Sequence, residues 1–252
     1  MKIKTIVSSI FLLVFISGCS SSGDKKDGPN LNKAAGINIQ LGSRYLEQGK
    51  LQLAKTKLTK AMQQDPDNAL AHSTMALLLE KVGQFEEIDD YYNEAISLDP
   101  SNSDIKNNFG TYLCNRARYD EAREQFNQAL NDPYYKTPIV AMINAGKCEI
   151  KSKNYKAAEK LLRKALRINS KSISALYFMG ELGIKSQRYL MTRAYMQRYH
   201  SLVQHSAQSL WIQIQAEKAL GDKQALNELF EKMNKNFPDS DEAGMMMELY
   251  RR

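Results

Sequence analysis

Residues Asn107–Leu130, with the sequence NNFGTYLCNRARYDEAREQFNQAL, decide the fold. Gly110 and Ala122 are small residues twelve positions apart, and the large Phe126 follows four residues later. Small side chains at this spacing let two successive helices approach closely, and a large side chain fills the space beside them. The stretch therefore predicts two packed helices joined by a short turn.

The same arrangement recurs along the chain with a period of about 34 residues. Gly42 and Gly146 are each followed twelve positions later by alanine, and Pro66 and Pro100 lie 34 residues apart. Proline lacks an amide donor and clashes with the preceding turn, so Pro66 and Pro100 are expected to end the second helix of the first two pairs. This pattern resembles the tetratricopeptide repeat.

The resemblance implies an all-α fold, a right-handed superhelical solenoid of about six helical hairpins plus a C-terminal capping helix. No helical pair buries its apolar face alone, so stacking of the repeats makes the fold. The assignment of the last two repeats depends mainly on the 34-residue period. Residues 241–252 are expected to form the capping helix. The six units that we delimit are 35–68, 69–102, 103–136, 139–172, 173–206 and 207–240.

The N-terminal residues are expected to form an export signal. Lys2 and Lys4 precede an apolar run that is too short to span a bilayer but suits a secretory signal peptide. The sequence ISGC that ends at Cys19 is similar to the lipobox of bacterial lipoproteins, in which the cysteine is acylated after cleavage. We therefore expect a lipoprotein signal peptide at residues 1–18 and lipid attachment at Cys19.

Residues 19–34 are rich in Ser, Gly, Asp, Lys and Asn, which predicts a flexible tether. In the lipoproteins that this segment resembles, an Asp after the cysteine retains the protein in the inner membrane. The residue here is Ser20. The resemblance thus implies a protein held by lipid at the periplasmic face of the outer membrane.

Two cysteines remain once Cys19 is acylated. Cys114 and Cys148 lie near the same level of the first helices of units three and four, which stack side by side. Export to an oxidising compartment favours a disulfide between them. The alternative is two separate buried thiols.

The first helix of each unit is expected to line a concave, partner-binding groove. An apolar strip on the first two units suits a helical or extended peptide with apolar anchors, unless the tether or a neighbouring helix covers it. Its residues are Ile39, Leu46, Leu70 and Leu77. On unit three we expect a polar ladder that bonds a peptide backbone or is a solvated face. The ladder includes Asn107, Thr111 and Asn115.

Two runs in units three and four carry a closer resemblance. NNFGTYLCNRARYDEAREQF at 107–126 and DPYYKTPIVAMINAGKC at 132–148, with the lipobox and the repeat count, resemble type IV pilus biogenesis lipoproteins of the PilF/PilW kind. This resemblance implies a pilotin, which binds the pilus secretin subunit, brings it to the outer membrane and supports its multimerisation. The alternative is a repeat lipoprotein that serves as an adaptor for outer-membrane barrel assembly or for cell-wall synthase complexes.

Other classes of function find no support in the sequence. The net charge of +7 is modest, and we expect the basic residues to be interleaved with acidic ones on solvated helix faces, which argues against nucleic-acid binding. His72, His200 and His205 have no neighbouring Cys, Asp or Glu at metal-ligand spacing. No phosphate-binding or nucleophile motif is present. We therefore expect no enzyme activity, metal, cofactor or small-molecule substrate.

Overall fold

A computed structural model describes residues 31–251, and within that range all regular secondary structure is α-helical. The thirteen helices are α1 (Leu31–Glu47), α2 (Leu51–Gln64), α3 (Ala69–Val82), α4 (Ile88–Leu98), α5 (Ser103–Asn115), α6 (Tyr119–Asn131), α7 (Pro138–Lys151), α8 (Tyr155–Ile168), α9 (Ile173–Lys185), α10 (Tyr189–His200), α11 (Ala207–Leu220), α12 (Lys223–Asn236) and α13 (Asp241–Arg251). None of these helices is long and apolar enough to cross a membrane.

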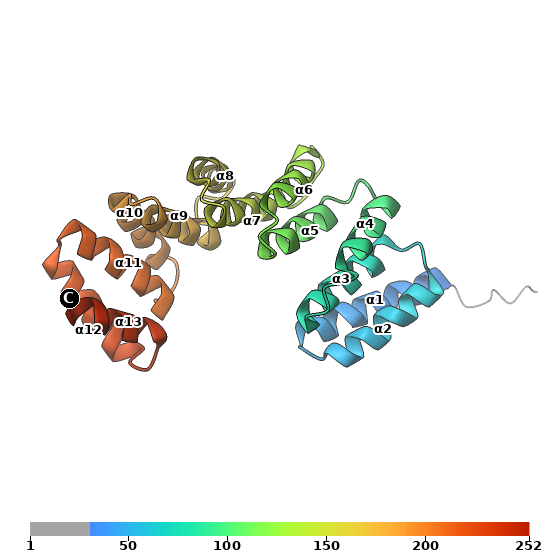
Figure 1. Ribbon diagram of the computed structural model, residues 1–252, viewed down its shortest axis with the longest axis horizontal. Coiled ribbons are helices and arrows are strands. Elements are labelled where there is room, and N and C mark those ends of the chain that lie inside the picture. The colour runs from blue at the N-terminus through green and yellow to red at the C-terminus, as the bar shows by residue number, and fades with distance from the viewer. Residues whose placement is uncertain (1–30, 252) are drawn as a thin grey trace, which may run out of the picture.

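The helices stack as successive hairpins into an open arch, with α1 and α2 at one end and α12 and α13 at the other (Figure 1). Helices α5 and α7 lie on the inner side of the arch, and their partners α6 and α8 lie on the outer side (Figure 1). The predicted all-α solenoid of tetratricopeptide repeats is confirmed. At the C-terminal end, α13 packs on α11 and α12 and buries Ala243 and Met246.

The N-terminal boundary differs from the sequence prediction. Helix α1 begins at Leu31, so residues 31–34 belong to the solenoid and the predicted end of the tether at residue 34 is wrong. The apolar face of α1 packs against the solenoid from its second turn, where Ala35 is fully buried. The signal peptide, Cys19 and the rest of the tether lie outside the described residues.

Close contact within each hairpin depends on the small residues that define the repeat. A Cβ atom added at Gly146 of α7 would lie 2.8 Å from Cγ of Leu162 on α8. At Gly110 of α5 the added atom would lie 3.0 Å from the ring of Phe126 on α6. Both distances are shorter than ordinary van der Waals contact, so a side chain at either position would force its neighbour to move.

Helix α4 is an exception among the second helices. It begins at Ile88, whereas α2 and α6 begin at Leu51 and Tyr119, three residues earlier in their units. Ile88 is fully buried and stands where Ala54 and Ala122 stand in the neighbouring units. A loop therefore precedes α4 where the neighbouring units already have a helical turn.

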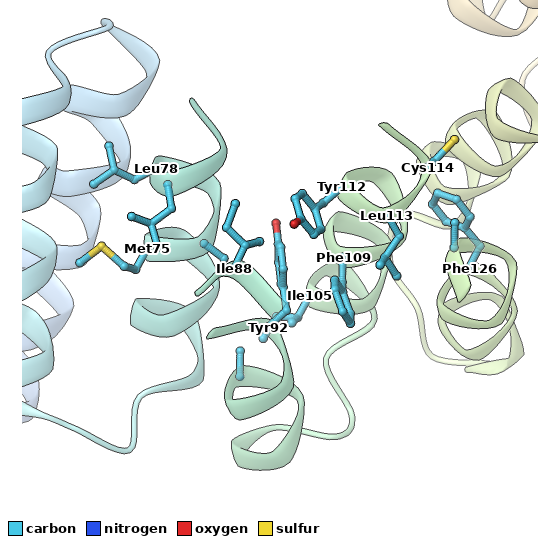
Figure 2. Close-up of a cluster of buried hydrophobic side chains, with 14 of the residues drawn as sticks. Met75, Leu78, Ile88, Tyr92, Ile105, Phe109, Tyr112, Leu113, Cys114 and Phe126 are labelled. Carbon is cyan, nitrogen blue, oxygen red and sulfur yellow. The ribbon is translucent and has the colours of Figure 1, made fainter. Parts of the chain in front are cut away.

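An aromatic cluster joins the second and third units. Tyr92 of α4 is fully buried, and its ring stacks on that of Phe109 of α5 with the centroids 4.9 Å apart (Figure 2). Tyr112 of α5 belongs to the same cluster, with its ring centroid 6.1 Å from that of Tyr92. The hydroxyl of Tyr92 has no hydrogen-bond partner within residues 31–251, and burial raises its pKa far above the usual value. Packing of rings rather than hydrogen bonding therefore fixes this contact.

Candidate partner-binding surface

Three of the four residues predicted for the apolar strip have accessible side chains. Leu70, near the start of α3, is 53% exposed. Leu46 of α1 and Leu77 of α3 are partly buried, because they pack against the edge of the main core. The accessible strip is therefore short, with Leu70 as its most exposed member.

Ile39 does not belong to this strip. Its side chain is only 3% exposed and packs against Ala61 of α2 and Ala71 of α3. The small side chains of these alanines leave room for a branched apolar residue between the helices. The prediction that Ile39 lines an open groove is therefore wrong.

The predicted polar ladder is largely occupied by bonds within the protein. Asn107 is 4% exposed, and its Oδ1 accepts a hydrogen bond of 3.1 Å from Nδ2 of Asn144 on α7. Thr111 Oγ1 donates to the carbonyl oxygen of Asn107 at 2.9 Å, within the same helix. Asn107 and Thr111 therefore make hydrogen bonds within α5 and between α5 and α7.

Asn115 is the accessible member of the ladder. Its Nδ2 donates to Oε1 of Glu80 at 3.2 Å, and its Oδ1 accepts from Nζ of Lys151 at 3.1 Å. These three residues lie at the ends of α3, α5 and α7, so they form a row across three consecutive repeats. The bonds are solvent-exposed and exchange readily, because net energies of such bonds are small. The row offers a partner a hydrogen-bond acceptor at Glu80, an amide at Asn115 and a donor at Lys151.

Cys114 and Cys148 form a disulfide that joins α5 to α7. Their Cα atoms are 5.8 Å apart, and both residues are buried. This separation lies within the range that an unstrained disulfide accepts. The bridge covalently ties two first helices of the solenoid immediately behind the surface that carries Asn115.

Ion pairs connect successive repeats at a recurrent place, which the sequence analysis missed. In four units the residue at position 21, on the second helix, pairs with a residue of the following unit. The charge at this position alternates in sign along the chain, at intervals of 34 to 36 residues, and that alternation is the signal in the sequence. The pairs are Asp89–Arg118 at 2.6 Å, Arg123–Glu149 at 2.6 Å, Glu159–Arg188 at 2.6 Å and Arg193–Glu217.

The acidic partners differ in burial. The side chains of Glu149 and Glu217 are 8% and 2% exposed, so removing their arginines leaves a buried carboxylate without its counter-ion. Glu159 is more accessible, and hydrogen bonds from Arg188 and then from Arg163 lower the pKa of its carboxyl group. All four pairs hold neighbouring repeats in one register.

The junction between the first two units lacks such a pair. Lys55 occupies position 21, and no ion pair holds it within residues 31–251. A recess of about 510 Å³ opens here between α2 and the loop before α4, compared with about 20 Å³ at the Arg123 junction. The recess is lined by Lys55, Thr59, Met75, Leu79, Gln84, Glu86, Glu87 and Tyr91.

Comparison with known protein families agrees with this architecture. A tetratricopeptide repeat model matches residues 69–102 and 139–172, which coincide with two of the units delimited from the sequence. A second tetratricopeptide repeat model matches residues 91–124, a stretch that begins in α4 and ends in α6.

The chain is 30% identical over 218 residues to the type IV pilus assembly protein PilF of Pseudomonas aeruginosa, and the match covers 85% of this chain and 86% of that protein. The chain belongs to the PilF family of type IV pilus biogenesis proteins. A crystal structure of PilW, described as a widely conserved type IV pilus biogenesis factor, superposes with a TM-score of 0.81 at 28% identity, covering 86% of this chain and 99% of that one. The structure of PilF from Pseudomonas aeruginosa gives a TM-score of 0.75 at 27% identity, covering 86% of this chain and 98% of that one.

Membership of the PilF family therefore extends over almost the whole described solenoid. Both structural relatives match over nearly their full length. The family places the protein in type IV pilus biogenesis, and the repeat class is one that mediates protein–protein contacts.

Proposed function

We propose that the protein is a non-enzymatic pilotin that binds the type IV pilus secretin subunit and promotes its outer-membrane localisation and multimerisation. The observation that carries this proposal is the match to PilF across 85% of the chain, which includes the solenoid and its inner face. A stacked solenoid presents a long, preformed surface, which suits capture of a segment from a larger partner.

Lipid attachment at Cys19 would place the protein at the outer membrane. The lipobox supports acylation of this residue, and Ser20 supports export to the outer membrane. More than one acyl chain on the cysteine would anchor the protein stably, since one chain alone binds membranes only marginally. The secretin subunit bound to the solenoid would then be carried to the membrane in which its pore forms.

The inner face of the first three repeats is the proposed contact with the secretin. Leu70 supplies an exposed apolar anchor, and Leu46 and Leu77 supply partly buried ones beside it. Asn115 adds hydrogen-bonding groups at the far end of the same set of first helices. A helical or extended segment with apolar residues at regular spacing fits such a surface.

Measurement of the affinity between the purified secretin subunit and this protein tests the proposal. Leu70→Glu is expected to weaken binding about tenfold or more, because a charged side chain replaces an apolar anchor. Leu53→Glu is the matched control, since Leu53 is 48% exposed on α2, in the neighbouring first repeat. Unchanged affinity in Leu70→Glu, or equal losses in both variants, would remove the inner-face assignment.

A further inference from the structure

The segment around α8 carries a concentration of positive charge. Between Lys151 and Lys171 there are eight basic residues and one acidic residue, Glu159. The expectation that basic and acidic residues are interleaved therefore fails in this segment. Helix α8 lies on the outer side of the arch (Figure 1).

Four of these cations form one row along the helix. Successive spacings of four, four and three residues place them on a single face of an α-helix, over about 16 Å of its length. They are Lys156, Lys160, Lys164 and Arg167. All four are exposed, whereas Ala158, Leu162 and Ala165 on the opposite face are fully buried. The row thus faces solvent.

No carboxylate within residues 31–251 forms an ion pair with any member of this row. Glu159 is the nearest acidic residue in the sequence, and it is held by Arg163 at 2.8 Å and by Arg188 at 2.6 Å. Like charges three and four residues apart destabilise a helix. The row therefore does not serve the stability of α8, and it is available to an external anion.

An exposed apolar side chain lies beside the row. Ile168 of α8 is 58% exposed and follows Lys164 by one helical turn. Cations together with exposed aliphatic side chains suit a bilayer interface, where phosphate groups meet acyl chains.

We propose that the outer face of α8 is a docking surface for the anionic headgroups of a lipid bilayer. This inference rests on the proposed lipid anchor. Cys19 and Leu31 are twelve residues apart, so the connecting chain spans at most about 40 Å and keeps the solenoid near the membrane. A polybasic surface supplies the second signal that makes acyl anchoring firm. With α8 on the membrane, the inner face points away from it and stays open to a partner.

Vesicle sedimentation tests this surface without the acyl chain. The protein is produced from residue 20 onward, which keeps the whole described solenoid and its core. It is mixed with phosphatidylcholine vesicles that contain or lack phosphatidylglycerol. We expect binding only to the vesicles with phosphatidylglycerol, and we expect binding to fall as salt is raised, because salt screens the attraction.

The paired substitution Lys160→Glu with Lys164→Glu is expected to lower vesicle affinity about tenfold or more. Lys223→Glu with Lys235→Glu on α12 is the matched control, since it changes the net charge equally at two exposed positions. The control should bind as the wild type does. Helical circular dichroism and the urea midpoint verify that both variants are folded.

Three results of the vesicle assay would each overturn the proposal: no preference for anionic vesicles, equal losses in both paired variants, or retained binding by the α8 variant. Salt-sensitive binding to duplex DNA without vesicle binding would assign the row to another polyanion and would also overturn it. The pilotin role is scored separately by secretin binding, which needs no membrane, so failure of one proposal does not decide the other.

Discussion

Arg123 of α6 reaches across a repeat junction to Glu149 of α7, with Nε 2.6 Å from Oε1 and Nη2 3.2 Å from Oε2. The same guanidinium also contacts Asp120 at 2.7 Å, but Asp120 is 96% exposed whereas Glu149 is 8% exposed. Arg123 thus pairs with one buried carboxylate and one exposed carboxylate. The energies of a buried and an exposed ion pair can therefore be compared at the same arginine.

Arg123→Ala is expected to lower the free energy of unfolding by about 1–2 kcal/mol, because Glu149 is left without its counter-ion. The estimate is below that for a fully buried pair, since Arg123 is itself 38% exposed. Asp120→Ala is the control and should cost less than about 0.5 kcal/mol. Urea unfolding of the three proteins measures both values, and similar losses in the two variants would contradict this account.

The disulfide between Cys114 and Cys148 closes a loop whose ends are 34 residues apart. Removing it with Cys114→Ser and Cys148→Ser together is expected to lower the free energy of unfolding by about 4 kcal/mol, because the unfolded chain gains entropy. Urea unfolding measures the loss. Mass spectrometry of the non-reduced exported protein gives an independent check, and two free thiols would rule out the bridge.

Gly146→Ala is expected to destabilise the protein by about 1–3 kcal/mol, since the new Cβ would lie 2.8 Å from Cγ of Leu162 and force α7 and α8 apart. Gly36→Ala is a control of the same chemistry, because no atom lies within 4 Å of its added Cβ in α1. It should stabilise the helix by about 0.5–1 kcal/mol. Thermal unfolding should therefore shift in opposite directions for these two variants.

His200 gives the protein a pH dependence. Burial, and then the neighbouring His205, lower the pKa of His200 from 6.5 to about 4. Below pH 6.5 the unfolded chain binds this proton more readily, so the stability contributed by the neutral ring is complete above pH 6.5 and falls between pH 6.5 and about 4. His200→Gln should reduce the loss of unfolding free energy between about pH 7 and about pH 5 by about 1–2 kcal/mol. An unchanged loss in urea unfolding would show that His200 is not responsible.

The helix pairs were predictable because their determinants are local and periodic. Gly110 and Gly146 face Phe126 and Leu162 across their hairpins, as the spacing of small and large residues indicated. The late start of α4 was not predicted, although the sequence has Ile88 at the position where the neighbouring units have alanine.

The candidate site was less predictable because a repeat position does not fix burial. Ile39 and Leu70 were both assigned to the predicted apolar strip. Ile39 is buried against Ala61 and Ala71, whereas Leu70 is exposed. The ion pairs across junctions join residues from different units, and their partners stand at two different positions of the following unit. Only the three-dimensional arrangement tells which partner Arg123 takes.

The pilotin account is tested most directly by the amount of heat-resistant secretin multimer in the outer membrane of a strain that lacks this gene. The account predicts that multimers and surface pili are lost, that the wild-type gene restores both, and that Leu70→Glu restores them poorly despite normal protein levels. Normal multimers and normal twitching motility in the deletion strain would contradict the account. Such a result would favour an adaptor with a different client.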